Sequence, residues 1–440
     1  MTDAKPPIGN DSGVGRREQA VASHTRTLVV CPYLAREAVA RTPEARREEA
    51  VGLAGAIDLN IVGSQIATLS EIRPATYLGK GKVEEIAARV TEEEIALVVM
   101  DCALSPVQQR NLEKAFSAKV IDRTGLILEI FGRRARTAEG TLQVELAHLE
   151  YQKSRLVRSW THLERQRGGF GFLGGPGETQ IETDRRLIQE RMIRITRDLE
   201  QVKKTRALHR KSRKHVPFPI VALVGYTNAG KSTLFNRLTR ADVMAADMLF
   251  ATLDPTMRAL RLPHGGAAIL SDTVGFISDL PTLLISAFRA TLEEVLAADV
   301  ILHVRDISHV DADAQAEDVK TILADLGVDR ADEKLIEVWN KVDRLDPERR
   351  AALTVSSLKP VAVSALTGEG IGDLLSAIET RLAEGRRTID LDLDGADGRS
   401  VHWLYEHAEV MSRRDDSDGR VHMTVRAAPE TMARILRRFA

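Results

Sequence analysis

Short apolar runs that alternate with segments of helical spacing organise the first third of the chain. Ala96–Val99 has the length and composition of a buried strand, whereas Val83–Val90 repeats apolar residues at helical spacing. Strands that alternate with helices are typical of a parallel sheet covered by helices. We therefore predict a small N-terminal α/β domain over residues 25–136, preceded by a polar tail over residues 1–24 that we expect to be disordered.

Two long amphipathic helices are predicted next, over residues 137–215. Leucines recur every seven residues from Leu142 to Leu163, and apolar residues then follow in steps of seven, four and three from Ile181 to Val202. Each pattern places apolar side chains along one face of a helix. We expect the two faces to meet in an antiparallel hairpin that projects from the globular parts.

The alternation of strands and helices returns after the hairpin. Residues 216–385 include apolar runs such as Pro219–Val224 and Leu335–Trp339, and residues 386–440 contain shorter runs such as Thr388–Leu393. The pattern predicts a larger α/β domain followed by a small C-terminal α/β unit. The whole chain is therefore assigned to the α/β class.

A glycine-rich turn follows the first strand of the larger domain. Residues 225–233 read Gly-Tyr-Thr-Asn-Ala-Gly-Lys-Ser-Thr and lead into a segment of helical spacing, which is the context that a P-loop requires. Its backbone N–H groups can close around phosphates, Lys231 can reach the terminal phosphates, and Ser232 can ligate Mg²⁺. The turn predicts a nucleotide site at this end of the strand.

Further motifs follow in the order that a nucleotide switch requires. Asp272 ends a second apolar run, where an acid can hold Mg²⁺ through water. Gly275 has no side chain, so its N–H can approach the γ-phosphate and respond to its loss. Between these motifs Thr252 is placed to give its hydroxyl to the metal, with Thr256 as the alternative.

The identity of the base is indicated by Asn-Lys-Val-Asp at residues 340–343. Asp343 can accept from two adjacent N–H donors of guanine that adenine lacks, so the wrong base would leave its carboxylate unpaired. Asn340 can hold N7 of guanine, and the stem of Lys341 can pack along the base plane. Residues 364–366 would complete the pocket with a backbone N–H directed at the guanine oxygen. These motifs predict a GTP site with bound Mg²⁺.

The residues assigned to this site fall into three groups. The predicted catalytic residues are Lys231, Thr252 and Gly275. The predicted metal ligands are Ser232 and Thr252, with Asp272 acting through water. The predicted GTP-binding residues are Gly225, Tyr226, Thr227, Asn228, Ala229, Gly230, Lys231, Ser232, Phe250, Ala251, Thr252, Leu253, Asp254, Asp272, Thr273, Val274, Gly275, Asn340, Lys341, Val342, Asp343, Ser364, Ala365 and Leu366.

The motifs, together with segments outside them, resemble the HflX family of translation-factor-related GTPases. The resemblance extends over about residues 26–385 and includes Ala75–Val83, Asp122–Leu128, Leu142–Leu146 and the glycine loop that runs into Gly177–Gln180. It implies a GTPase that binds the large (50S) ribosomal subunit and acts in ribosome splitting, rescue, translation or ribosome biogenesis under stress. It also implies that the glycine loop probes the peptidyl-transferase region of that subunit.

Phe276 follows Gly275 at the position where many small GTPases carry a glutamine that orients the attacking water. A phenyl ring cannot hydrogen-bond to water. We therefore expect slow intrinsic hydrolysis and stimulation by a partner. Alternatively, Phe276 packs beneath a switch helix, and this too removes the usual catalytic side chain.

The hairpin carries a local excess of positive charge, although the whole chain has 62 Lys and Arg against 63 Asp and Glu. Residues 151–215 contain 17 Lys and Arg and 7 Asp and Glu, which suits a polyanionic partner. Apolar side chains stand in the glycine loop, where they can stack on unpaired RNA bases or fold back on the helices. The basic helix end can contact RNA or form a solvated face. The predicted RNA-contact residues are Phe170, Phe172, Leu173, Lys203, Lys204, Arg210 and Lys211.

Composition narrows the class of protein further. With 440 residues, 43% of them hydrophobic, the chain can form two or three domains with real cores. No run of eighteen apolar residues and no N-terminal apolar signal segment occur, so we expect a cytoplasmic protein, which we take to be a monomer. Cys31 and Cys102 lack metal-ligand spacing, and we expect buried thiols.

Two other functions remain compatible with the sequence. One is a GTPase that assists RNA modification, which would need a catalytic thiol or a second cofactor site. The other is a switch for a protein partner, with the hairpin serving as an oligomerisation coiled coil.

Overall fold

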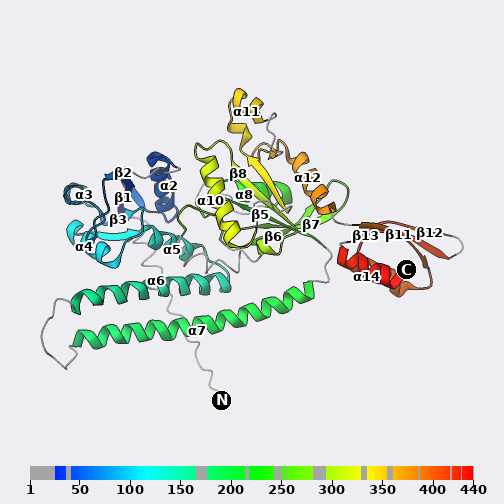
Figure 1. Ribbon diagram of the computed structural model, residues 1–440, viewed down its shortest axis with the longest axis horizontal. Helices are drawn as coiled ribbons and strands as arrows, with labels where there is room; N and C mark the ends of the chain where they lie inside the picture. The colour runs from blue at the N-terminus through cyan, green and yellow to red at the C-terminus, as the bar shows by residue number, and fades with distance from the viewer. Residues whose placement is uncertain are drawn as a thin grey trace, which may run out of the picture. The chain divides into compact units, whose positions relative to one another are not determined.

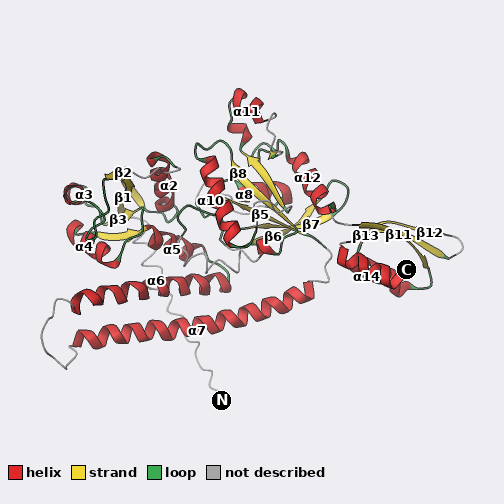
Figure 2. Ribbon diagram, in the orientation of Figure 1, coloured by secondary structure: helices red, strands yellow, loops and turns green. Residues whose placement is uncertain are grey.

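The computed structural model describes residues 25–35, 41–164, 176–213, 218–241, 249–250, 252–253, 255–280, 294–328, 334–353, 360–384, 387–416, 419–427 and 429–439. The chain divides into two compact units. The first comprises residues 1–195, 247–251 and 280–287, and the second comprises residues 196–246, 252–279 and 288–440. Figures 1 and 2 show the helices and strands of the chain. Among the described residues, no helix combines the length and the apolar character needed to cross a membrane.

A four-stranded parallel sheet forms the centre of the first unit, with strand order β2-β1-β3-β4. Its strands are β1 (Arg26–Leu34), β2 (Asn60–Leu69), β3 (Leu97–Met100) and β4 (Lys119–Asp122). Helices α2 (Pro43–Gly55), α3 (Lys80–Glu92), α4 (Pro106–Phe116) and α5 (Arg123–Arg134) accompany the sheet. The predicted parallel α/β layer is confirmed.

Strand β2 was not expected from the apolar pattern. It lies at the edge of the sheet and most of its side chains are only partly buried. Its centre carries the polar residues Ser64 and Gln65 beside Gly63. An edge strand with this composition lacks the continuous apolar run that identifies a buried strand.

The two predicted long helices are α6 (Ala138–Glu164) and α7 (Pro176–Arg213), which run antiparallel (Figure 1). Arg191 of α7 donates to Glu145 of α6 at 2.8 Å, and Lys153 of α6 donates to Gln189 of α7. Within α7 the predicted apolar face includes the most buried described side chains, Ile195 and Leu199.

Helix α6 differs from the expectation of a freely projecting stalk. Among its described side chains, the most buried are Gln143, Val144 and Ala147, whereas the described leucines of the seven-residue repeat, such as Leu149, are half-buried. The reason is that α6 also packs against α4 and α5 of the first unit. The first part of the hairpin is therefore joined to the α/β layer.

Asp122, at the carboxyl end of β4, connects α6 to the first sheet through hydrogen bonds. Its carboxylate is 1% exposed and accepts hydrogen bonds from Tyr151 Oη (2.6 Å) and Arg155 Nη2 (2.6 Å) of α6. It also accepts from the backbone N–H groups of Leu104 (3.1 Å) and Gly125 (2.8 Å). These four donors satisfy the buried carboxylate, and the two from Tyr151 and Arg155 tie α6 to the end of β4.

A six-stranded sheet forms the larger part of the second unit, with strand order β10-β9-β8-β5-β7-β6. All neighbouring strands are parallel except the β6 and β7 pair. The strands are β5 (Ile220–Gly225), β6 (Thr256–Arg261), β7 (Ala267–Asp272), β8 (Val300–Asp306), β9 (Leu335–Asn340) and β10 (Val361–Ala362). The helices are α8 (Lys231–Thr239), α10 (Ala312–Asp325), α11 (Pro347–Leu353), α12 (Ile371–Ala383) and the short 3₁₀ helix η1 (Val342–Arg344).

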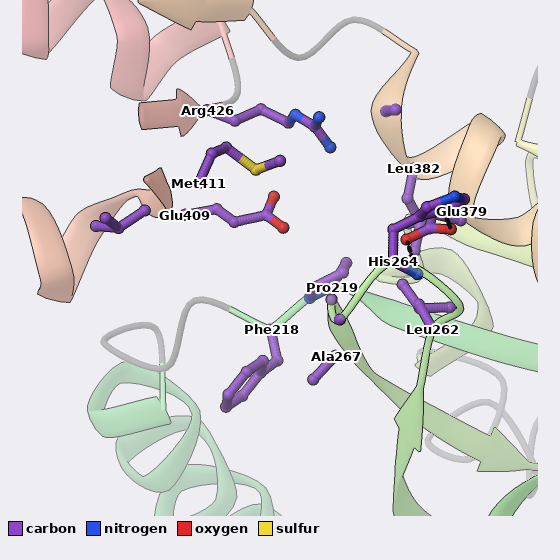
Figure 3. A pocket seen from close by; sticks show the side chains of 14 residues that line it. Phe218, Pro219, Leu262, His264, Ala267, Glu379, Leu382, Glu409, Met411 and Arg426 are labelled. Atoms are coloured by element: carbon purple, nitrogen blue, oxygen red, sulfur yellow. Dashed lines mark hydrogen bonds and ion pairs between the residues drawn. The ribbon is translucent and has the colours of Figure 1, made fainter. Parts of the chain in front are cut away.

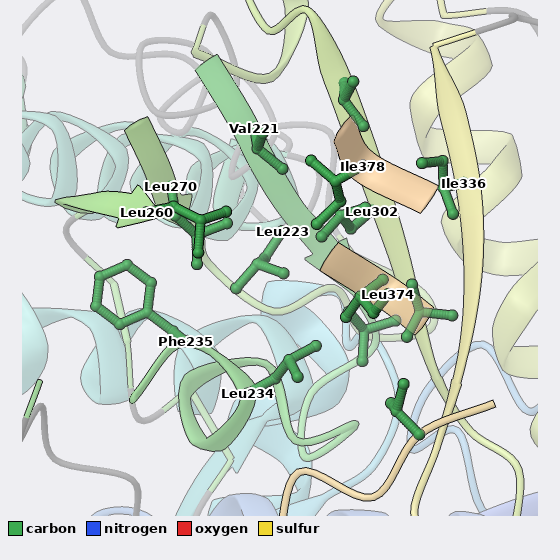
Figure 4. Close-up of a cluster of buried hydrophobic side chains, with 14 of the residues drawn as sticks. Val221, Leu223, Leu234, Phe235, Leu260, Leu270, Leu302, Ile336, Leu374 and Ile378 are labelled. Carbon is green, nitrogen blue, oxygen red and sulfur yellow. The ribbon is translucent and has the colours of Figure 1, made fainter. Parts of the chain in front are cut away.

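The core of this sheet holds the helix that follows the P-loop. Leu234 and Phe235 of α8 are fully buried against strand residues such as Leu223 and Leu270 (Figure 4). Leu374 of α12 joins the same cluster. Burial of a large apolar side chain contributes about 1.5–3 kcal/mol, so α8 has a fixed position at the end of β5.

His303 is buried in the second unit, where its charged form is unfavourable. Its side chain is 1% exposed, and among the described residues neither ring nitrogen has a hydrogen-bond partner. Burial lowers the pKa of His303 from 6.5 to about 4. Between these two pH values the unfolded chain binds a proton that the folded chain does not, so stability should fall as the pH falls.

Replacing this histidine should therefore reduce the sensitivity to acid. We expect His303→Leu to lose less stability than the wild type between pH 7 and pH 4.5, by up to about 3 kcal/mol. Urea unfolding followed by tryptophan fluorescence measures the difference. His402→Leu, at an exposed histidine of the C-terminal segment, is the control and should keep the wild-type pH dependence. An equal pH dependence in both variants would contradict the assignment.

The C-terminal segment forms a separate three-stranded antiparallel sheet with order β11-β13-β12. Its strands are β11 (Arg387–Asp394), β12 (Glu409–Asp415) and β13 (Arg420–Ala427), and its helices are α13 (Gly398–His407) and α14 (Pro429–Phe439). Leu404, Met423, Val425 and Ile435 are central to its core. The predicted α/β character of this segment is confirmed.

Candidate functional site

The P-loop connects β5 to α8 and is in direct contact with the Asn-Lys-Val-Asp motif. Asn340 Nδ2 donates to the carbonyl of Ala229 at 2.8 Å. Gly230 has φ of 89°, and a Cβ at this position would collide with the Asn340 amide. Only glycine meets both conditions, since it has no Cβ and adopts positive φ without strain.

Lys231 is buried at the first turn of α8. Its Nζ donates to the carbonyl oxygens of Gly225 (3.0 Å) and Tyr226 (2.8 Å). Burial lowers the pKa of Lys231 to about 8, and the neighbouring Asp272 opposes that shift. A buried ammonium held largely by carbonyl groups gains most from an added negative charge, so this position favours phosphate.

Three side-chain oxygens from different elements converge beside Lys231. Asp272 Oδ2 accepts from Ser232 Oγ at 2.8 Å and from Thr252 Oγ1 at 3.0 Å, and the two hydroxyl oxygens are 2.9 Å apart. Burial raises the pKa of Asp272, and Lys231 and both hydroxyls oppose that shift. Asp272 Oδ1 is buried without a hydrogen-bond partner among the described residues. An oxygen-only set with a spare carboxylate atom fits a hard cation such as Mg²⁺.

The structure places the two candidate threonines differently. Thr252 lies at the cluster of oxygens, whereas Thr256 begins β6 and pairs with Asp272 across the antiparallel ladder. Phe250, another predicted GTP-binding residue, belongs to the first unit, where its ring meets Phe131 edge to face with centroids 4.7 Å apart.

The segment after Asp272 is bonded to the P-loop through its backbone. The N–H of Thr227 donates to the carbonyl of Phe276 at 2.7 Å, and the N–H of Phe276 donates to the carbonyl of Gly225 at 3.1 Å. A Cβ at Gly275 would lie 3.0 Å from Lys231 Nζ, so a side chain here would press on the lysine. The Phe276 ring is 1% exposed and is therefore packed in the interior.

The residues of the predicted guanine pocket lie together at the ends of β9 and β10. The N–H of Ala365 donates to Asn340 Oδ1 at 3.0 Å, which joins the two base motifs. Lys341 has φ of 65° and precedes η1, which contains the partly exposed Asp343. Ser364 is buried and its Oγ accepts from the N–H of Thr367 at 3.1 Å.

Two residues next to this pocket were not expected from the sequence. Arg237 of α8 donates from Nε to the carbonyl of Ala365 at 3.0 Å and from its guanidinium to the carbonyl of Leu366. Asp306 ends β8 and pairs with Lys341. An acid at the carboxyl end of a buried strand was a signal for Asp306, because the carboxyl ends of parallel strands meet at one edge of the sheet.

A hollow of about 390 Å³ lies elsewhere in the second unit (Figure 3). Its lining includes Phe218, His264, Glu379, Met411 and Arg426, and His264 Nδ1 lies 2.6 Å from a Glu379 carboxylate oxygen. Five motifs were predicted to bind the nucleotide, and none of their residues lines this hollow; the motifs are residues 225–233, 250–254, 272–275, 340–343 and 364–366.

Several predicted residues lie outside the described part of the chain. Among the RNA-contact candidates these are Phe170, Phe172 and Leu173, and at Lys203, Arg210 and Lys211 only the helical backbone of α7 is described. Lys204 is exposed on α7. Ala251 and Asp254 of the predicted GTP site also lie outside the residues that the structure describes. Within the described ranges there is no group of three or more His, Cys, Asp and Glu residues that could hold a metal.

Four consecutive segments match known protein families. Residues 44–132 match the GTP-binding GTPase N-terminal family and residues 134–213 match its middle region. Residues 220–341 match the 50S ribosome-binding GTPase family, and residues 351–440 match the HflX C-terminal domain.

Two relatives that match most of the chain agree with these family matches. The chain is 51% identical to a protein named GTPase HflX from Magnetococcus marinus, over 88% of this chain and 89% of that protein. It is 46% identical to GTPase HflX of Escherichia coli K12, over 86% of this chain and 88% of that protein. Among solved structures, a GDP complex of a GTP-binding protein from Sulfolobus solfataricus covers 82% of this chain and 99% of its own, at 21% identity and a TM-score of 0.44.

Proposed function

The chain belongs to the HflX family of GTPases, and from this membership we propose that its GTP-bound form docks on the large ribosomal subunit through the hairpin of α6 and α7. The observation that carries the proposal is the continuity of the basic hairpin with the nucleotide site. Helix α7 ends at Arg213, and β5, which leads into the P-loop, begins at Ile220. Contact of the hairpin with RNA can therefore act on the GTPase site over a short length of chain.

We infer that the five motifs bind different parts of the nucleotide and its metal ion. Asn340, Lys341 and Asp343 hold guanine, and the P-loop amides with Lys231 hold the phosphates. Ser232 and Thr252 would hold Mg²⁺, with Asp272 acting through water, and the convergence of their oxygens supports this assignment. When bound, Mg²⁺ neutralises charge that develops on the phosphate oxygens.

The chain's own groups support hydrolysis by position and charge. Lys231 stabilises negative charge on the phosphates, and Gly275 offers a backbone N–H to the γ-phosphate. The buried Phe276 ring has no polar atom with which to orient water. We propose that hydrolysis is slow in the isolated protein, that a partner accelerates it, and that loss of the γ-phosphate releases Thr252 and Gly275.

We propose that the protein acts in the cytoplasm under stress, where it splits or rescues stalled ribosomes or takes part in ribosome biogenesis. The protein would act as a monomer. The basic character of residues 151–215 supports an RNA partner, because neutralised phosphates release counterions and so favour binding.

The test is the rate of GTP hydrolysis by the purified chain, alone and with purified large ribosomal subunits. We expect stimulation of at least about tenfold, which declines as salt is added. Slow turnover without stimulation would be compatible with the GTPase activity but would contradict the proposal that the large ribosomal subunit is the partner.

A variant of the glycine loop tests the docking surface. Phe170→Ala with Phe172→Ala should weaken binding to the large subunit by about tenfold or more, since each base stacked on an aromatic ring contributes about 1–3 kcal/mol. Phe218→Ala is the control, because this phenylalanine is 47% exposed and lies outside the loop. Unchanged binding in the loop variant would contradict the role of the loop. Concentration-dependent mass without RNA affinity would instead favour an oligomerisation hairpin.

A further inference from the structure

Asp306 lies at the base end of the nucleotide site, although it belongs to none of the five motifs. It is the last residue of β8, and the parallel register places it beside Asn340, the last residue of β9. The N–H of Ile307 donates to the Asn340 carbonyl at 3.2 Å, which extends the strand pairing by one step. The position of Asp306 relative to the base motif is therefore set by the sheet.

Both oxygens of the Asp306 carboxylate are in use. Oδ1 accepts from the N–H of Ser308 at 3.1 Å and from its Oγ at 2.6 Å. Oδ2 accepts from Lys341 Nζ at 2.7 Å. Because Ser308 orients the carboxylate from one side, the other oxygen is held toward the lysine.

The pair is shielded from solvent more than a surface ion pair. The side chains of Asp306 and Lys341 are 11% and 15% exposed. Exposed pairs contribute little because water and salt screen them, whereas a partly buried, hydrogen-bonded pair keeps more of its strength.

The pair also determines the path of the Lys341 side chain. A Cβ at Gly230 of the P-loop would lie 3.8 Å from Lys341 Cε, so the stem lies near the P-loop while its ammonium is held by Asp306. A lysine stem loses up to about 2 kcal/mol of conformational entropy when it is ordered. Because the ion pair already orders the stem, nucleotide binding does not have to supply this entropy cost.

We propose that Asp306 is a positioning residue of the guanine pocket, which fixes Lys341 so that its stem is presented to the face of the base. The proposal rests on the guanine site described above. Asp306 does not touch the reacting phosphate, so its effect should fall on nucleotide affinity and not on the chemical step.

The test compares Asp306→Asn with Asp313→Asn in the full-length protein. Asp313 is a matched control because it is also an aspartate paired with a cation, Arg305, but its side chain is fully exposed at the start of α10. We expect Asp306→Asn to weaken GDP binding by about tenfold through faster dissociation, which corresponds to the loss of one hydrogen bond to a charged group. The kcat for GTP hydrolysis should stay unchanged while KM rises, and Asp313→Asn should behave as the wild type.

A double-mutant cycle with Lys341→Ala separates positioning from a general structural role. If Asp306 acts through Lys341, adding Asp306→Asn to Lys341→Ala should cause no further loss of GDP affinity. Asp306→Glu, which keeps the charge, should recover part of the affinity. Additive losses in the cycle, or an Asp306→Asn variant that matches Asp313→Asn, would overturn the proposal. Failure of the wild type to bind GDP would instead count against the guanine site itself.

Discussion

Asp343→Asn should change the nucleotide preference of the protein from guanine to xanthine. The Asp343 carboxylate is expected to accept from two N–H groups of guanine, whereas xanthine carries an oxygen in place of the exocyclic amine. An asparagine can donate to that oxygen and still accept from the ring N–H. Sites built around such hydrogen bonds reject analogues by about 10⁴, so we expect the ratio of GDP to XDP affinity to change by about that factor.

Competition between GDP and XDP for a fluorescent nucleotide measures this ratio. Asp346→Asn is a matched control, since Asp346 lies three residues further on, is exposed, and accepts from the backbone N–H of Arg349 at 2.8 Å. The control should keep the wild-type ratio. Retained GDP selectivity in Asp343→Asn would show that another group reads the base.

Lys231→Ala should lower kcat/KM for GTP by about 10²- to 10³-fold while the fold remains intact. The side chain is buried, and its Nζ is bonded to two P-loop carbonyl groups. Its removal takes away the positive charge that is expected to stabilise the transferring phosphate. Because burial already lowers the pKa of Lys231, removing the amine should not destabilise the folded chain severely.

Single-turnover hydrolysis and thermal unfolding together test this expectation. Lys320→Ala is the control, because Lys320 lies on α10 of the same sheet domain and pairs with Glu317 at the surface. It should hydrolyse GTP as the wild type does. If the Lys231→Ala variant hydrolyses GTP at the wild-type rate and has a normal melting curve, Lys231 does not contribute to hydrolysis.

Much of the fold could be predicted because the sequence patterns that indicate its helices and strands are local. The helix expected from the spacing of Val83–Val90 is present as part of α3, Lys80–Glu92, because the repeat of apolar residues is read within a few turns of chain. The strand before the P-loop was equally clear from its apolar run. The edge strand β2 was missed because an edge position does not require a continuous apolar sequence.

The motif residues lie close together in the structure, but the contacts that position them were not visible in the sequence. Asp306 and Lys341 are 35 residues apart, and Arg237 and Ala365 are 128 residues apart. No periodicity links positions at such separations. Only the order of the strands in the sheet brings their carboxyl ends to one edge, where these side chains can meet.

The sequence by itself therefore determined the family resemblance, the α/β class and the residue types of a candidate guanine-nucleotide site, because each depends on short motifs and local spacing. The tertiary structure brings the Thr252 hydroxyl to Ser232 and Asp272, whereas Thr256 pairs with Asp272 only in the β6–β7 ladder. It also decided that α6 packs against the first sheet domain through Asp122. Both outcomes depend on buried polar groups finding partners across the fold, which is a property of the packed chain as a whole.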